Sequence, residues 1–185
     1  MQQLVVLSGL PASGKTTLGR ALAARLQAPF FDKDDFLELL FDSNGIGDTA
    51  HRQALSRQAD EELTQAVSKF PVAVVTSWWR HPVSSTQSGT DPWWLAQPGT
   101  VHMEVHCQCS PQTAAERFLR RTRHPGHLDG RWTEQELRAL LVKQGTLGPL
   151  TKHAINVVTE QSVAESQLVQ LHRAVERWLS ASSEA

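Results

Sequence analysis

The stretch Leu4-Val5-Val6-Leu7-Ser8-Gly9-Leu10-Pro11-Ala12-Ser13-Gly14-Lys15-Thr16-Thr17 decides the fold of this chain. An apolar run comes first, a turn bounded by two glycines follows, and a helical pattern begins at Thr17. The glycines and the pair Lys15-Thr16 fill every required position of the spacing G-x-x-x-x-G-K-[ST]. Glycines allow the backbone of such a turn to curl, so that successive N–H groups point inward and surround phosphate oxygens. The opening of the chain therefore predicts a phosphate-binding loop between a buried strand and a helix.

Two side chains add specific chemistry to this loop. A lysine at the position of Lys15 reaches the β- and γ-phosphates of a nucleotide, and the hydroxyl of Thr16 can ligate Mg²⁺. The helix that follows, to about Leu26, points its positive N-terminal end at the same anion. We therefore expect a nucleoside triphosphate to bind here. The expected contacts come from the loop and the first turn of the helix: Gly9, Pro11, Ala12, Ser13, Gly14, Lys15, Thr16 and Thr17.

Length and composition limit the other possibilities. The 185 residues suit a single domain with a proper core, residues 1–185. A formal net charge of −1 argues against a strongly basic protein built to bind nucleic acid nonspecifically. No apolar run reaches the roughly 18 residues of a membrane span, and the first strand begins too early to leave room for a signal peptide. We expect a cytoplasmic monomer or homodimer that acts on a small molecule, without a nucleic-acid or membrane partner.

Apolar runs alternate with helical patterns along the rest of the chain, which predicts parallel strands joined by crossover helices. The expected strands are residues 3–7, 29–31, 72–76, 101–107 and 154–158. In the fourth of these, His102, Glu104 and His106 alternate with apolar residues, a pattern that favours a strand near the edge of the sheet. The fold class we expect is an α/β three-layer sandwich, with about five mostly parallel strands flanked by helices.

An acidic segment, Asp32-Lys33-Asp34-Asp35, follows the second predicted strand and so emerges at the same sheet edge as the phosphate loop. A carboxylate there can accept a proton from an attacking hydroxyl or help to hold Mg²⁺. The alternative is that these acids cap a helix beginning near Phe36. We interpret Asp34 as the catalytic base and Asp35 as the cap and a candidate substrate contact. Asp32 and Asp34, with Thr16, are the candidate metal ligands.

Four arginines make 117–123 the most basic segment of the chain, and a histidine-flanked turn, His124-Pro125-Gly126-His127, follows it. Guanidinium groups neutralise the charge on a phosphoryl group in transit, although an arginine-rich helix end can also simply complement the helix dipole. We expect a lid over about 117–134. The residues assigned to catalysis are Arg117 and Arg121, with Arg121 also at the nucleotide, and those assigned to the substrate are Arg123, His124 and His127. The two histidines alternatively bind a metal or lie exposed.

Two segments lack the periodicity of framework elements: a polar loop over 42–52 and a tryptophan-containing loop over 77–99. We expect both to line the rim of the phosphate site. Tryptophans in the second loop either form an apolar wall for a ring-bearing or sugar-like substrate or pack one loop on the other. The candidate substrate contacts in this loop are Trp78, Trp79 and Arg80, and Trp93 and Trp94 complete the group of tryptophans. No acid follows the third strand to support Mg²⁺.

The phosphate loop at 9–16, the acids at 32–35 and the arginine segment 117–127, in this order, resemble the P-loop kinases of small molecules. Proteins of this pattern include shikimate and gluconate kinases, chloramphenicol phosphotransferase, zeta-type toxins and the kinase part of polynucleotide kinases. The arginine run looks like the broad, mostly uncharacterised ATP-binding branch of the family. The resemblance spans nearly the whole chain. It implies ATP and Mg²⁺ as cofactors, Asp34 as the base that activates the acceptor hydroxyl, and a lid after the fourth strand that brings arginines to the phosphates.

One position departs from that pattern. Polynucleotide kinases and zeta-type toxins usually place an arginine three residues beyond the acid, where it grips an acceptor phosphate, and this chain has Leu37 there. The departure favours an acceptor without a phosphate at that point. We therefore expect an ATP-dependent phosphotransferase that acts on the hydroxyl of a small metabolite or antibiotic. The alternatives are a kinase of nucleic-acid 5′-ends and a non-catalytic, nucleotide-dependent switch.

Overall fold

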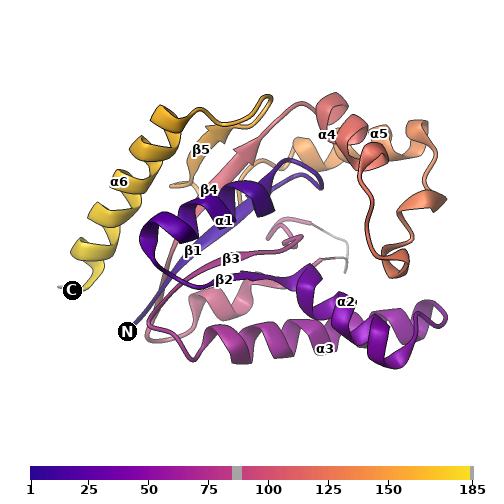
Figure 1. Ribbon diagram of the computed structural model, residues 1–185, viewed down its shortest axis with the longest axis horizontal. Coiled ribbons are helices and arrows are strands. Elements are labelled where there is room, and N and C mark those ends of the chain that lie inside the picture. Colours follow the sequence, from indigo (N-terminus) through magenta and orange to yellow (C-terminus); the bar gives the residue numbers. More distant parts are fainter. Residues whose placement is uncertain (85–88, 184–185) are drawn as a thin grey trace.

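A computed structural model describes residues 1–84 and 89–183 of the chain (Figure 1). Its centre is a five-stranded sheet in the order β2-β3-β1-β4-β5, and every neighbouring pair is parallel. The strands are β1 (Gln2–Gly9), β2 (Phe30–Asp32), β3 (Val72–Thr76), β4 (Thr100–Gln108) and β5 (Ile155–Val158). The predicted α/β fold is confirmed.

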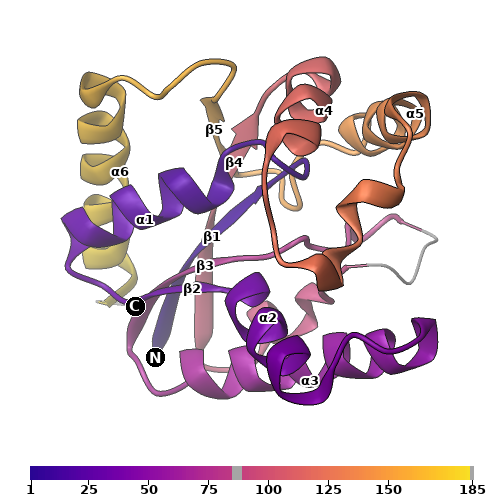
Figure 2. The same ribbon diagram turned by 45° about the vertical axis from the view of Figure 1, so that its right-hand side comes forward.

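Helices cover both faces of this sheet, as Figures 1 and 2 show. The α-helices are α1 (Lys15–Leu26), α2 (Lys33–Asn44), α3 (Thr49–Val67), α4 (Pro111–Arg120), α5 (Glu134–Gly145) and α6 (Glu165–Ser183). The short 3-10 helices are η1 (Pro92–Ala96), η2 (Pro125–His127) and η3 (Asp129–Arg131). Within the described residues, no helix has both the length and the apolar character to cross a membrane.

The core has a layer on each side of β1. Val5 and Leu7 join the layer that packs against α1 and α6, whereas Leu4 and Val6 join the layer beneath α3 and η1. Successive side chains of a strand point to opposite faces, so the central strand supplies both layers in turn. A strand buried on both faces needs a continuous apolar run, which is what the sequence shows at 4–7.

The fourth strand has the position that its pattern predicted. β4 lies near the edge of the sheet, between the central strand β1 and the edge strand β5. Its side chains at 103, 105 and 107 pack into the core, while His102 and Glu104 point to the other face and contact polar partners there. The alternation in the sequence therefore reflects a strand with one apolar face and one face that carries buried polar contacts.

The start of α2 also differs from the prediction. Asp32, the last residue of β2, is the N-cap, and its Oδ1 accepts a hydrogen bond from the Asp34 backbone N at 3.1 Å. The helix therefore begins at Lys33, and the interpretation of Asp35 as its cap is wrong. The predicted polar loop is shorter than expected as well, because α2 continues to Asn44 and α3 begins at Thr49.

Candidate active site

The phosphate loop owes its shape to backbone conformations that few residues adopt. Gly9, Ala12 and Gly14 have φ angles of +129°, +60° and +93°. A Cβ at Gly9 would lie 2.4 Å from the Cys107 carbonyl oxygen, so only glycine fits there. Gly14 is the N-cap of α1 and provides no side-chain acceptor, which leaves the N–H groups of the first turn available to an anion. The loop thus has the geometry of an anion site.

Lys15 lies folded against this loop. Its Nζ donates to the backbone oxygens of Gly9 at 3.0 Å and Leu10 at 2.8 Å. Burial lowers the pKa of Lys15, an effect that the carboxylates Asp32 and Asp34 oppose. The ammonium group is therefore held by two carbonyl oxygens that a bound phosphate can replace. Apart from Arg121 in the lid, the remaining predicted nucleotide contacts lie in the loop or, for Thr16 and the exposed Thr17, in the first turn of α1.

Thr16 and Asp32 form the candidate magnesium site. The Thr16 hydroxyl donates to Asp32 Oδ2 at 2.7 Å, and Asp32 is 5% exposed. Burial, followed by the charge of Asp34, raises the pKa of Asp32 to about 6. Burial makes the ionised form of this carboxylate costly, and a nearby cation would stabilise that form. The Thr16–Asp32 pair therefore fits Mg²⁺. In the described part of the chain no group of three His, Cys, Asp or Glu side chains could hold a metal. Phosphate oxygens and water would have to complete the coordination.

Thr76 occupies the position at the end of β3 where the sequence lacks an acid. It is the register partner of Asp32, is 1% exposed, and its Oγ1 has no hydrogen-bond partner among the described residues. A buried hydroxyl without a partner is a group that a water molecule or a ligand can satisfy. Thr76 therefore adds one neutral oxygen beside the Thr16–Asp32 pair.

Facing the phosphate loop is a second group of side chains, on α2 and on the segment between α4 and α5. Three carboxylates recur every four residues along α2 and therefore share one helix face. Each contacts a basic side chain of the segment that descends onto α2 in Figure 2. These α2–lid pairs are Asp34 with Arg123, Glu38 with His127 at 2.8 Å, and Asp42 with His124 at 3.1 Å.

Ring packing accompanies the α2–lid pairs. The Phe41 ring stacks on His124 at 5.5 Å between centroids and meets His127 edge-on at 6.0 Å. Between the two histidines, Gly126 lies so close to Phe41 that a Cβ would be 2.2 Å from a ring carbon. Arg52 Nε donates to the Gly126 carbonyl oxygen at 3.2 Å. The tip of the lid therefore fits closely over α2, and the two histidines are part of that fit.

The three predicted lid arginines lie in different surroundings. Arg121 stacks over Phe118 at 4.2 Å and pairs with Asp129 at 3.0 Å, and its charge adds to the lowering of the Lys15 pKa. Arg123 contacts Asp34 and also lies 3.0 Å from His127. Arg117 instead donates to the backbone oxygens of residues 159 and 160, after β5. The structure thus brings Arg121 and Arg123 toward the site and holds Arg117 at the end of β5.

Of the two alternatives for the tryptophans, packing of one part of the loop on another is confirmed for Trp79 and Trp94, whose ring centroids lie 5.9 Å apart. The assignment of Trp79 to the substrate is therefore wrong. Trp79 and Trp94 are each 6% exposed and lie in the core layer beneath α3, where the Trp79 indole donates to the Leu7 carbonyl oxygen at 2.8 Å. In the described part of the chain between β3 and β4, η1 is the only helix, and the two indole rings fill part of the sheet face beside it. Trp78 and Trp93 are exposed.

The two other predicted substrate residues form ion pairs elsewhere. Arg80 Nη1 pairs with Asp91 at 3.0 Å, and Asp35 pairs with Arg20 of α1 at 3.6 Å across an exposed surface. Neither residue belongs to the α2–lid pairs. Part of the predicted rim loop, residues 85–88, lies outside the described residues.

The sequence did not reveal a buried hydrogen-bond and ion-pair network that connects the start of α2 to neighbouring elements. Lys33, 7% exposed, pairs with Asp60 of α3 at 2.8 Å and donates to Ser56 at 3.0 Å. Asp60 accepts in turn from Thr90 at 2.7 Å, and Thr90 lies 2.5 Å from the Ser77 hydroxyl. The network joins α2, α3 and the end of β3. The available signal in the sequence was Lys33, which lies between Asp32 and Asp34. A lysine in a buried segment needs an ionic partner, because an unpaired charge is costly to bury.

Comparisons with known proteins agree with this geometry. A family model described as "AAA domain" matches residues 4–142. A shikimate kinase of Burkholderia thailandensis is 41% identical over 69 residues, which cover 33% of this chain and 36% of that protein. One from Bacteroides thetaiotaomicron is 32% identical over 75 residues, which cover 40% and 42%. The matched segments therefore span well under half of these relatives.

Solved structures match over almost the full length. A putative kinase from Chloroflexus aurantiacus has a TM-score of 0.73 and 21% identity, with 97% of each chain covered. Shikimate kinase from Bacteroides thetaiotaomicron has a TM-score of 0.59 and 20% identity, covering 96% of this chain and 98% of that one. A gluconokinase from Sinorhizobium meliloti has a TM-score of 0.56 and 20% identity, covering 95% and 97%. At these identities the likeness shows the shared fold.

Proposed function

The chain belongs to the AAA domain family and has shikimate kinases among its relatives, and on this premise we propose that it is an ATP-dependent small-molecule kinase. It transfers the γ-phosphate to a hydroxyl of a metabolite or an antibiotic. The observation that carries the proposal is the placement of Asp34. Its half-exposed carboxylate lies in the first turn of a helix whose cap, Asp32, accepts a hydrogen bond from Thr16 of the phosphate loop. The Thr16–Asp32 hydrogen bond thus connects the helix that carries the candidate base to the phosphate loop.

On the donor side, the backbone N–H groups of the loop bind the phosphates, and Lys15 exchanges its two carbonyl partners for β- and γ-phosphate oxygens. Thr16 and Asp32 hold Mg²⁺, with Asp34 as the further candidate ligand. When bound, the ion neutralises charge on the phosphates. These residues would fix the donor in place for transfer of its terminal phosphate.

On the acceptor side, Asp34 accepts the proton of the attacking hydroxyl. Arg123 pairs with this carboxylate in the structure, so a bound acceptor has to displace it. The released guanidinium and that of Arg121 then offset charge on the transferred group. We retain a lid over about 117–134 and a rim loop over about 77–99 as part of this proposal, while the rim loop between α2 and α3 shortens to residues 45–48. With Leu37 in place of an arginine, the acceptor carries no phosphate at that point.

The test is the rate of ADP release from Mg-ATP by the full chain, alone, with a panel of hydroxyl-bearing metabolites and antibiotics, and with oligonucleotides. Acceptor-stimulated turnover supports the proposal. Stimulation by oligonucleotides alone replaces it with a 5′-end kinase. Nucleotide binding without any stimulated turnover contradicts it and leaves a nucleotide-dependent switch.

A further inference from the structure

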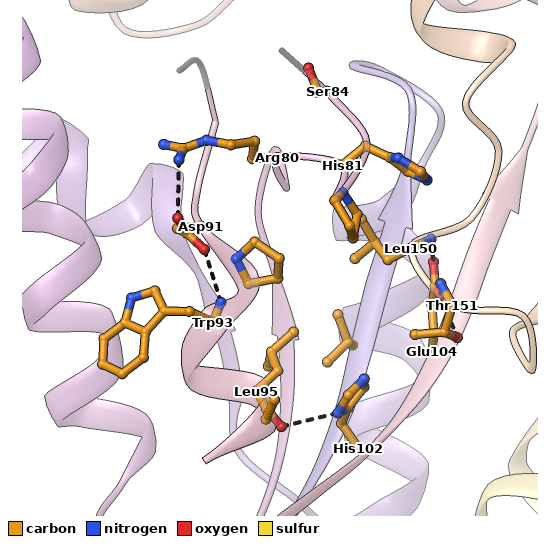
Figure 3. A pocket seen from close by; sticks show the side chains of 14 residues that line it. Arg80, His81, Ser84, Asp91, Trp93, Leu95, His102, Glu104, Leu150 and Thr151 are labelled. Carbon is orange, nitrogen blue, oxygen red and sulfur yellow. Dashed lines mark hydrogen bonds and ion pairs between the residues drawn. The ribbon is translucent and has the colours of Figure 1, made fainter. Parts of the chain in front are cut away.

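A cavity of about 510 Å³ lies beside η1, on the face of β1 and β4 that Val6 and Glu104 share (Figure 3). A volume of this size suits one small ring-bearing molecule. Its apolar wall includes Val6, Leu95, Leu150 and the exposed ring of Trp93. No residue of the phosphate loop and none of the α2–lid pairs lines it. The cavity is therefore separate from the site described above.

The local fold explains why this space is open. Between β3 and β4, the described residues contain only the short helix η1, and Trp79 and Trp94 fill just part of the sheet face beneath it. His102 and Glu104, two residues apart on β4, point to the same face and both line the remaining space. The alternating polar positions of β4 are thus the polar end of a cavity.

The hydrogen bonds at this end decide which ligand groups fit. His102 Nδ1 lies 3.1 Å from the Leu95 carbonyl oxygen, and a carbonyl only accepts, so Nδ1 carries the proton. In the neutral ring Nε2 is then an acceptor. Thr151 Oγ1 donates its proton to Glu104 at 2.9 Å, so its lone pairs can accept as well. This end of the cavity offers acceptors, and a ligand must bring a donor.

Glu104 adds a negative charge beneath these acceptors. Its side chain is 0% exposed and accepts from the Ser8 hydroxyl, the Thr151 hydroxyl and the backbone N–H groups of Leu150 and Thr151. All of these donors are neutral. His106 lies 3.8 Å away, but burial lowers the pKa of its ring and so favours the neutral form. A positive group in the cavity would therefore meet a carboxylate whose hydrogen-bond donors, among the described residues, are all neutral.

The basic groups elsewhere around the cavity are already engaged. Arg80 pairs with Asp91, as Figure 3 shows. His81 uses both ring nitrogens, Nε2 with the Pro149 carbonyl oxygen at 2.9 Å and Nδ1 as the acceptor for the Val83 backbone N at 3.3 Å. Their charges do not oppose a cation at the far end.

We propose that this cavity is a second ligand site, for a small apolar amine. The apolar body packs on Leu95, Leu150 and Trp93, and the amino group donates to His102 Nε2 and Thr151 Oγ1 above Glu104. The proposal concerns a site apart from the kinase chemistry and does not depend on it.

The test uses benzylamine, which is protonated at neutral pH, and benzoate, which carries the same ring with the opposite charge. Titration calorimetry on the full chain should show one benzylamine bound per chain and no binding of benzoate. His102→Phe should weaken benzylamine binding about tenfold, because it removes the acceptor and keeps the ring. The matched control is His172→Phe on α6, which packs on the opposite face of the sheet, and it should leave binding unchanged.

A second variant covers the case in which His102→Phe does not fold. Ala96, an exposed residue of η1, also lines the cavity, so Ala96→Leu fills it without disturbing the core. It should weaken benzylamine binding and leave Mg-ADP binding intact. The proposal is overturned if benzylamine does not bind, if benzoate binds equally well, if Ala96→Leu has no effect, or if Mg-ADP displaces benzylamine.

Discussion

The two halves of the candidate active site are held together differently. The phosphate loop takes its shape from consecutive backbone, with φ angles set by Gly9 and Gly14 and a lysine that bonds to carbonyls five and six residues away. The acceptor side consists of side-chain pairs between α2 and the lid, and the partners are 82 or 89 residues apart in the chain. The first half is a local structure, and the second exists only when the lid docks.

This difference predicts which measurements separate the two halves. A change in the phosphate loop should affect nucleotide binding and turnover together, because the same backbone serves both. A change on the acceptor side should spare nucleotide binding, because the loop does not depend on the docked lid. The four variants below, from the largest expected effect to the smallest, test that separation.

Lys15→Ala should have the largest effect. We expect turnover to fall by about 10³-fold or more and nucleotide affinity to fall with it, because the variant loses the cation at the β- and γ-phosphates. The fold should be intact, since Lys15 bonds only to carbonyl oxygens of the loop. Kinetics, nucleotide titration and circular dichroism measure the three quantities. Normal nucleotide affinity in this variant would contradict the assignment of Lys15.

Asp34→Asn should impair only the acceptor side of the candidate active site. We expect the rate to fall by about 10²-fold or more while nucleotide affinity remains, because an amide cannot accept the acceptor's proton. Glu61→Gln, on the exposed side of α3, is the matched control and should behave as the parent protein. An unchanged rate in Asp34→Asn would remove Asp34 as the base.

Asp32→Asn, on the donor side, should change the stability of the folded protein in a pH-dependent way. The raised pKa means that the folded protein disfavours ionised Asp32, so stability is lost as the pH rises from about 3.8 to about 6. Asparagine also serves as an N-cap. Without nucleotide at pH 7, the variant should therefore be more stable by about 3 kcal/mol. Urea unfolding at pH 7 and at pH 4 measures this gain, which should nearly vanish at the lower pH. A variant less stable than the parent at pH 7 would refute it.

Gly126→Ala should have the smallest effect, confined to the lid. Its added Cβ would meet the Phe41 ring at 2.2 Å, so we expect the lid tip to lose about 1 kcal/mol of docking energy. Limited trypsin cleavage at the lid arginines should become about fivefold faster.

The matched control for the lid is Gly130→Ala. A Cβ there has nothing within 4 Å, and neither glycine has a positive φ, so the backbone change is equivalent. Cleavage of this control should match the parent protein. Equal cleavage of both variants would mean that Gly126 does not hold the lid on α2.

The sequence predicted the donor half closely and the acceptor half only by residue type. The spacing from Gly9 to Thr16 fixes a local backbone path, so the loop, the strand before it and the helix after it could all be inferred. Arg123, His124 and His127 were recognised as candidates, but Glu38 and Asp42 were not. Their spacing along α2 is visible in the sequence, whereas the side chains that meet them are not.

Errors occurred where burial, not local pattern, decides. Trp79 and Trp94 looked like neighbours of Trp78 and Trp93, yet the first two fill the core because little other structure covers the sheet there. The burial of Glu104 on β4 was also not foreseen, because a buried, hydrogen-bonded glutamate and a surface glutamate read the same in sequence.

By itself, then, the sequence determined the parallel α/β framework and a phosphate loop, because strand burial and glycine conformation are set by neighbouring residues. The tertiary structure alone decided that Arg123 meets Asp34, that Arg117 lies at the end of β5, and that His102 and Glu104 enclose a cavity. Those contacts join residues far apart in the chain, and only the packing of helices and strands brings such residues within bonding distance.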